Sequence, residues 1–126
     1  MEYTNEQLYT FLSKLNQEIL SHEELMFPVK VNFYIQKNKN ILMPLVQEIE
    51  DVRLKILSNY GEINEETQQY QLHPETMDQA IKEFNDLFAV KQIVNFCKFD
   101  LAELGSVALT MPQMDALMFM IKEETE

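Results

Sequence analysis

Residues 28–61, PVKVNFYIQKNKNILMPLVQEIEDVRLKILSNYG, decide the fold. Residues 29–36 alternate apolar and polar side chains, as a β-strand does. A longer pattern begins at residue 31, in alternating steps of four and three residues: Val31, Ile35, Asn38, Leu42, Leu45, Ile49, Val52 and Ile56. A strand explains nothing beyond Ile35, whereas one face of a helix explains the whole pattern. The sequence therefore predicts one long helix over about residues 28–59.

Prolines and a glycine mark the limits of this helix. Pro28 suits a first helical turn, where a missing N–H costs nothing, and Gly61 suits the position after the last turn. Pro44 lies in the middle and removes one backbone donor. We therefore expect the helix to be kinked or broken near residues 40–42.

Three further helices are predicted on either side of the long one. The first opens with a capping box at residues 4–7 (TNEQ) and runs to about residue 20. The second begins at Pro74 and carries an apolar stripe to about residue 88. The last opens with another capping box at residues 110–113 (TMPQ) and runs to about residue 123.

Two short segments have the composition of β-strands. Residues 68–72 are one, and residues 90–99 (VKQIVNFCKF), rich in β-branched and aromatic side chains, are the other. We expect them to pair as a minimal sheet that needs helix packing for stability. The predicted fold class is mainly α (α+β), a single helical domain over residues 1–126 with a long, kinked central helix and a minor two-stranded β element.

Charge and composition exclude several classes of protein. The net charge of −11 opposes binding to nucleic acids and anionic membranes, because their phosphates would be repelled. No segment approaches the roughly 20 apolar residues that span a bilayer, and residues 1–11 do not resemble an export signal. Cys97 is the only cysteine, which excludes an internal disulfide and favours a reduced, cytoplasmic setting. Basic proteins stay open as partners, including by mimicry of nucleic acid.

The sequence contains no motif for catalysis, and we expect no catalytic residue, metal or cofactor. His22 and His73 lack the spacing of metal ligands, and Gly61 and Gly105 are too few for a phosphate-binding loop. We therefore expect a protein that is not an enzyme. A pair of carboxylates assembled by the fold stays open as an alternative.

One gap in the acidic residues indicates a candidate site. Residues 25–47 contain no Asp or Glu, where about four are expected, and they contain three lysines. We interpret this gap as a site for a small anionic, nucleotide-like ligand. The predicted ligand-binding residues are Lys30, Tyr34, Lys37, Asn38, Lys39 and Arg53. The alternative is that the lysines only form the solvated side of a helix whose other side is core.

The last predicted helix is apolar on more than one face. Residues 118–120 (MFM) point in three directions, and an adaptable Met-rich surface suits contact between subunits. We therefore expect a homo-oligomer. The predicted interface residues are Met114, Met118, Phe119 and Ile121. Asn38, polar within the heptad pattern, either fixes the register of paired helices or bonds within one chain.

Three stretches of the chain match the pattern of a known family: residues 4–15 (TNEQLYTFLSKL), residues 28–62 and residues 109–121 (LTMPQMDALMFMI). The matching features within them are Pro28-Val29-Lys30, Lys37-Asn38, Arg53 and Tyr60-Gly61. On these features, nearly the whole chain resembles a family of small uncharacterised proteins carried by tailed phages of Gram-positive bacteria. The resemblance implies a phage protein that acts in the cytoplasm of an infected bacterium, and it implies no particular activity.

Three functions fit these observations. The first is a counter-defence protein that sequesters a nucleotide-derived immune signal in a pocket between the subunits of a homo-oligomer. The second is an acidic protein–protein interaction module that inhibits or adapts a host or phage protein, including by mimicry of nucleic acid. The third is an accessory protein for phage assembly.

Overall fold

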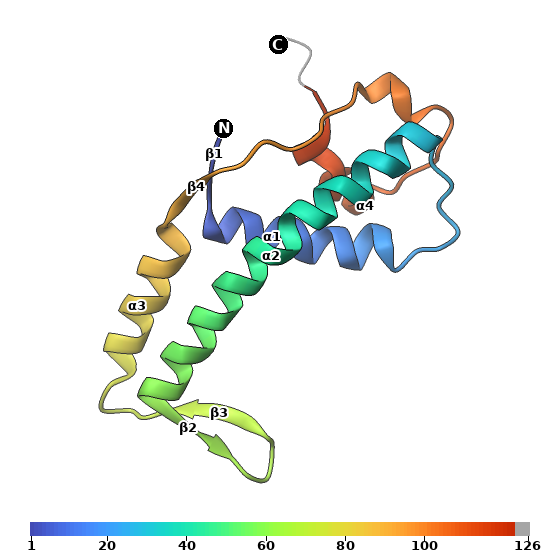
Figure 1. The fold of residues 1–126 in the computed structure, drawn as a ribbon. Helices are drawn as coiled ribbons and strands as arrows, with labels where there is room; N and C mark the ends of the chain where they lie inside the picture. The colour runs from blue at the N-terminus through green and yellow to red at the C-terminus, as the bar shows by residue number, and fades with distance from the viewer. Residues whose placement is uncertain (123–126) are drawn as a thin grey trace.

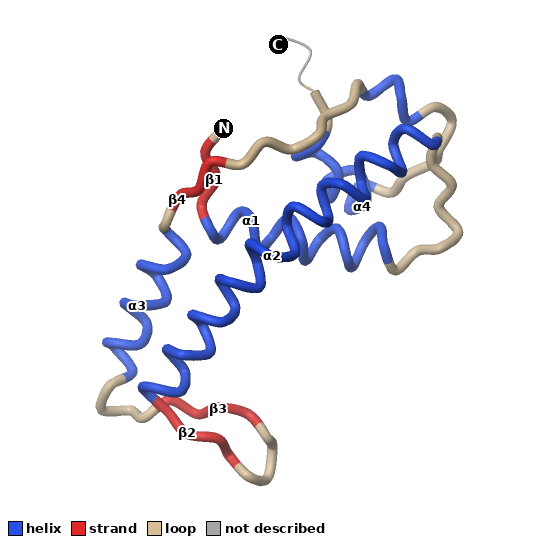
Figure 2. Tube along the Cα trace, viewed as in Figure 1, coloured by secondary structure: helices blue, strands red, loops and turns tan. Residues whose placement is uncertain are grey.

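The computed structural model describes residues 1–122 as a mainly helical chain with two small antiparallel sheets (Figures 1 and 2). The α-helices are α1 (Asn5–Lys14), α2 (Val29–Tyr60), α3 (Met77–Ala89) and α4 (Met111–Leu117). The strands are β1 (Glu2–Thr4), β2 (Gly61–Asn64), β3 (Gln69–Leu72) and β4 (Lys91–Ile93). The shorter helical segments are the π-helix η1 (Leu15–Leu20) and the 3₁₀-helices η2 (Leu101–Leu104) and η3 (Met118–Met120). The predicted fold class, mainly α with a long central helix and a minor β element, is confirmed.

Helix α2 is the longest element of the described structure, and α1 and α3 both pack against it. It comprises 32 residues, so its length is about 48 Å at 1.5 Å per residue. Residues 29–36 are helical, as the heptad pattern predicted. The helix continues through Pro44 without a break, which excludes one of the two predicted outcomes. The other outcome, a kink near residues 40–42, stays a prediction. The carbonyl of Asn40, which loses its donor to Pro44, belongs to an exposed residue that water can reach.

The heptad positions of α2 form a buried seam. Exposed fractions do not exceed 6% at Val31, Ile35, Asn38, Leu42, Ile49 and Ile56. Leu45 is half-buried, and Val52 is 42% exposed. The same chain covers this seam: η1 and α4 pack on its first half, α1 crosses its middle, and α3 lies along its second half (Figure 1). The heptad positions therefore pack within one chain.

The strands pair differently from the prediction. β2 and β3 form a hairpin that directly follows α2, with Glu62 opposite Gln71. β4 pairs with β1, with Tyr3 opposite Gln92. The predicted pairing of residues 68–72 with residues 90–99 is therefore wrong. β2 (GEIN) is too polar to be recognised as a strand, and it lies next to β3 in sequence, where a hairpin closes at the least entropic cost.

Gly61 follows α2 as predicted, but its backbone is extended rather than left-handed (φ −156°). A Cβ atom at Gly61 would lie 2.4 Å from the carbonyl oxygen of Gln71 on β3. Glycine is therefore required here by the close approach of two strands.

The two capping boxes are confirmed, and two helix boundaries differ from the prediction. Gln7 and Gln113 accept from the N-cap backbones of Thr4 and Thr110, whose hydroxyls accept in return. α3 begins at Met77 because Pro74 lies in the preceding turn. α4 ends at Leu117 and continues as η3, after which Ile121 pairs with Phe99. The predicted end at residue 123 lies outside the described residues.

The buried side chains are concentrated at one end of the molecule. Two clusters, one around Phe99 and Leu117 and the other around Leu8 and Leu42, lie where α1, α4 and the first part of α2 meet. The rest of α2, the β2–β3 hairpin and α3 project away as an arm (Figure 1). We call residues 48–90 the acidic arm. Only Ile49, Ile56 and Ala80 are buried within it.

Candidate functional site

Lys30, the first lysine of the predicted site, is held by its neighbours. Its Nζ lies 2.5 Å from Oε1 of Glu103 and 5.5 Å from the centre of the Tyr34 ring. The hydrogen bond with Glu103 raises the pKa of Lys30 above its usual value. The same bond, helped by the backbone N–H of Asp100, lowers the pKa of Glu103. A carboxylate of this chain therefore already neutralises Lys30.

Lys37 lies on the same face of α2, seven residues further on. Its Nζ is 5.5 Å from the centre of the Phe33 ring. Each of these lysines is thus paired with an aromatic ring, a contact worth about 0.5–1 kcal/mol at exposed positions. The structure brings together Lys30, Tyr34 and Lys37 of the predicted ligand-binding residues.

Asn38 does not face solvent. Its side chain is fully buried, and its amide nitrogen donates to the carbonyl of Cys97 at 2.8 Å. Its amide oxygen accepts from the N–H of Cys97 at 2.7 Å. Of the two predicted roles for this polar residue, the structure shows the hydrogen bond within one chain.

Lys39 and Arg53 lie apart from the other lysines. Lys39 is two residues beyond Lys37, about 200° around the helix, and it is half-buried. Arg53 lies a further 14 residues along, about 21 Å away. It donates to Glu50 from Nε at 2.9 Å and from Nη2 at 2.5 Å. These bonds raise the pKa of Arg53 and lower that of Glu50. The six predicted residues therefore do not form one site in a single chain.

The predicted interface residues are divided between core and surface. Ile121 is buried, and Met114 packs against the same core cluster. Phe119 stacks on Phe11, with ring centres 4.6 Å apart and planes 9° from parallel. Met118 is 55% exposed. Met118 is therefore the member of this set most available for contact with another molecule.

The acidic arm carries most of the charge of the molecule. Its acidic residues are Glu48, Glu50, Asp51, Glu62, Glu65, Glu66, Glu75, Asp78, Glu83 and Asp86. Its only basic residues are Arg53, Lys55 and Lys82. Ten acids and three bases give the arm a formal charge of −7, out of −11 for the chain.

The arm also leaves apolar side chains uncovered, because two helices and a hairpin provide few surfaces to bury them. Val52, Ile81 and Val90 are 42%, 47% and 50% exposed. A groove of about 330 Å³ lies between α2 and α3, lined by Val52, Ile56, Leu87, Val90, Glu83 and Asp86. Carboxylates therefore flank an open apolar surface. The sequence did not predict this groove. A count of charges over residues 48–90 would have shown the excess of acidic residues, but not that exposed apolar side chains lie beside them.

Comparison of the chain with family models, curated proteins and solved structures found no match. The resemblance to a phage family stays a prediction. Within residues 1–122, no three His, Cys, Asp or Glu side chains are placed to hold a metal ion. No helix in that range has both the length and the apolar composition to cross a bilayer.

Proposed function

We propose that this protein is a non-enzymatic binding protein that docks through its acidic arm onto a basic, amphipathic segment of another protein. The observation that carries this proposal is the coincidence of charge and apolar exposure on the arm. Seven of the eleven net negative charges lie there, beside the open groove between α2 and α3. No other part of the described chain combines these two properties to this degree.

The chemistry of the groove defines the partner. Apolar side chains of the partner would cover Val52 and Val90, which supplies affinity by removing apolar surface from water. Lysines or arginines beside them would meet Glu83 and Asp86 at the edge. The charge of the whole arm would steer such a partner toward the groove and raise the rate of association.

A second copy of this chain is a poor occupant of the groove. Two arms that each carry −7 repel one another, so self-association through this surface is opposed. The partner is therefore a different protein. Because the chain resembles phage proteins, we propose that this partner is a host protein or a virion component in the cytoplasm of an infected bacterium.

Sequestration of a nucleotide-derived signal by the predicted lysine site has weaker support. Lys30 is already paired with Glu103, Arg53 is already paired with Glu50, and Asn38 is buried. A homo-oligomer would have to bring Lys37 from two subunits together to restore the charge that such a ligand needs. Docking of a partner on the acidic arm requires no such association of subunits.

A defined peptide tests the docking proposal. The probe is a synthetic helical peptide with one leucine face and one lysine face, and the measurement is its Kd by fluorescence anisotropy. The double variant E83K/D86K is expected to weaken binding at least tenfold, because two charge-assisted contacts become repulsive. The matched control E2K/E23K changes the net charge equally, at two exposed positions outside the arm.

The comparison of the two variants decides the outcome. A large loss for E83K/D86K with a small loss for E2K/E23K supports docking at the groove. Equal losses would mean that the peptide responds only to net charge, and the proposal would then fail. If the proposal holds, a partner captured from infected cells by the native protein is lost with E83K/D86K and kept with E2K/E23K.

A further inference from the structure

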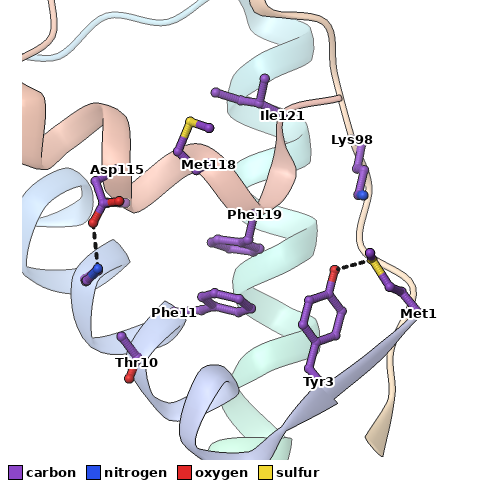
Figure 3. Close-up of a pocket in the computed structure, with 11 residues that line it drawn as sticks. Met1, Tyr3, Thr10, Phe11, Lys98, Asp115, Met118, Phe119 and Ile121 are labelled. Atoms are coloured by element: carbon purple, nitrogen blue, oxygen red, sulfur yellow. Dashed lines mark hydrogen bonds and ion pairs between the residues drawn. The ribbon is translucent and has the colours of Figure 1, made fainter. Parts of the chain in front are cut away.

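A second cavity lies away from the acidic arm, where β1 and α1 meet the segment after β4 and the end of α4 (Figure 3). Its volume is about 330 Å³, near the lower end of the range for small-molecule sites. None of the residues of the arm lines it. Any ligand held there would therefore be independent of the docking function proposed above.

Aromatic rings form the wall of this cavity. Phe11 and Phe119 are stacked, and Tyr3 meets Phe11 edge to face with ring centres 5.5 Å apart. Figure 3 shows these three rings near one another, with Met118 beyond Phe119 and Met1 beside Tyr3. Planar rings pack favourably against such surfaces, and thioethers adapt to the shape of what they contact.

The charge around this cavity is opposite in sign to that of the whole protein. Two lysines, Lys14 and Lys98, line it with one carboxylate, Asp115. Nζ of Lys14 lies 2.6 Å from Oδ2 of Asp115, so these two charges offset each other. Lys98 is half-buried and forms no ion pair with any residue in the range 1–122. Among the described residues, one positive charge therefore lines the aromatic cavity without a carboxylate partner.

We propose that this cavity binds a small planar aromatic anion. The ring of the ligand lies against Phe119 and Tyr3, and its anionic group pairs with Lys98. The anionic group is a carboxylate or a phosphate, since a lysine ammonium accepts either as a point charge. An aromatic acid and a nucleoside monophosphate share this chemistry.

The methionines of the chain provide a direct test. In protein labelled with ¹³C at the methionine methyls, Met1 and Met118 report on the cavity, and the exposed Met26 and Met111 do not line it. The probes are 2-naphthoate, adenosine monophosphate and the neutral 2-naphthalenemethanol. We expect one or both anions to shift the Met1 and Met118 signals through the ring current, with the neutral alcohol binding at least tenfold more weakly.

Variants locate the contact. Lys98→Gln is expected to raise the Kd of the anion about tenfold, whereas Lys91→Gln, the same change on β4 outside the cavity, alters it less than twofold. Met118→Trp places a bulky ring at the opening and is expected to abolish the shift of Met1.

The same measurements can overturn the proposal. It fails if no probe shifts Met1 and Met118, if Met26 and Met111 shift as strongly, or if the neutral alcohol binds as well as the anions. It also fails if K98Q and K91Q behave alike. The ratio of affinities for naphthoate and adenosine monophosphate then distinguishes a carboxylate ligand from a phosphate ligand.

Discussion

Asn38 and Cys97 are joined by two hydrogen bonds in the interior of the molecule. The amide of Asn38 donates to the carbonyl oxygen of Cys97 at 2.8 Å and accepts from its N–H at 2.7 Å. Cys97 belongs to the extended segment after β4, between Val94, whose N–H donates to the carbonyl of Met1, and Phe99, whose N–H donates to the carbonyl of Met120. The side chain of Asn38 thus pairs both backbone groups of Cys97 and fastens this segment to the first half of α2.

Replacing Asn38 with leucine is expected to destabilise the protein by about 2–4 kcal/mol. The leucine has the same branching, although its methyl groups are larger than the amide atoms, and it leaves the N–H and the carbonyl of the half-buried Cys97 without their partner, at about 1–3 kcal/mol each. The measurement is the free energy of unfolding in urea. Asn40→Leu, two residues along the same helix at an exposed position, is the control and should change stability by less than about 0.5 kcal/mol. Equal effects of the two substitutions would contradict the role given to Asn38.

Replacing Gly61 with alanine is expected to cost about 1–3 kcal/mol, through forced displacement of the hairpin. The added Cβ would meet the carbonyl oxygen of Gln71 at 2.4 Å, and backbone at both sites must shift. Hydrogen exchange should therefore accelerate at the amides of β2 and β3 and stay unchanged in α1. Asn59→Ala, at an exposed position near the end of α2, is the control. Unaltered exchange in the hairpin of the Gly61 variant would show that the strands are not held this closely.

These two residues also show how far sequence reasoning reaches. The heptad spacing predicted that Asn38 is in the seam, and the position of Gly61 predicted the end of α2, because both signals lie in the local sequence. The partner of each residue was not predictable. Cys97 and Gln71 reach them only through the tertiary fold. The same holds for the paired strands β1 and β4, in which Glu2 lies opposite Ile93, 91 residues further along the chain.

The candidate site was predicted less well for a related reason. The helix predicted over residues 28–59 put Lys30, Tyr34 and Lys37 on one face through their spacing of four and three residues, and α2 has them there. Glu103 is 73 residues from Lys30 in sequence, and no local pattern could show that it neutralises that lysine. The Glu50–Arg53 pair is local, at helical spacing, and could have been recognised.

The ion pair of Lys30 with Glu103 is expected to make part of the stability depend on pH. The pKa of Glu103 is lowered from its ordinary value of 4.5 in the folded protein, chiefly by the hydrogen bond with Lys30. The contribution of this carboxylate is therefore present above pH 4.5 and is lost as the pH falls through the lowered pKa. The pKa of Lys30 is raised above 10.5, so its contribution is present below that pH and is lost as the pH rises through the raised value.

Two measurements check this dependence. The difference in unfolding free energy between the native chain and Glu103→Gln should be constant near neutral pH and shrink in acid below pH 4.5. In a ¹³C titration of the carboxyl groups, Lys30→Met should move the pKa of Glu103 back toward 4.5, and Lys37→Met should not. If the pKa of Glu103 is the same with and without the Lys30 substitution, the two side chains do not interact in solution.

Phe119→Ala distinguishes a core role from a subunit interface for the end of α4. The Phe119 ring stacks on Phe11 and meets Phe96 with ring centres 4.9 Å apart, and both partners belong to the same chain. Loss of this ring is expected to cost about 2–4 kcal/mol of unfolding free energy, somewhat below the range for fully buried phenylalanines. Met118→Ala, at the exposed neighbouring position, should cost less than about 0.5 kcal/mol.

The dependence on protein concentration separates the two roles. If Phe119 acts within one chain, the loss of stability is the same at micromolar and at hundredfold higher concentration, because no association step is involved. If residues 114–121 instead form the predicted homo-oligomer interface, stability rises with concentration in the native chain, and both the Phe119 and Met118 variants reduce that rise. Light scattering on the same samples gives the mass directly. A monomer mass with concentration-independent stability would assign the methionine-rich end of α4 to the core and leave Met118 for the cavity beside it.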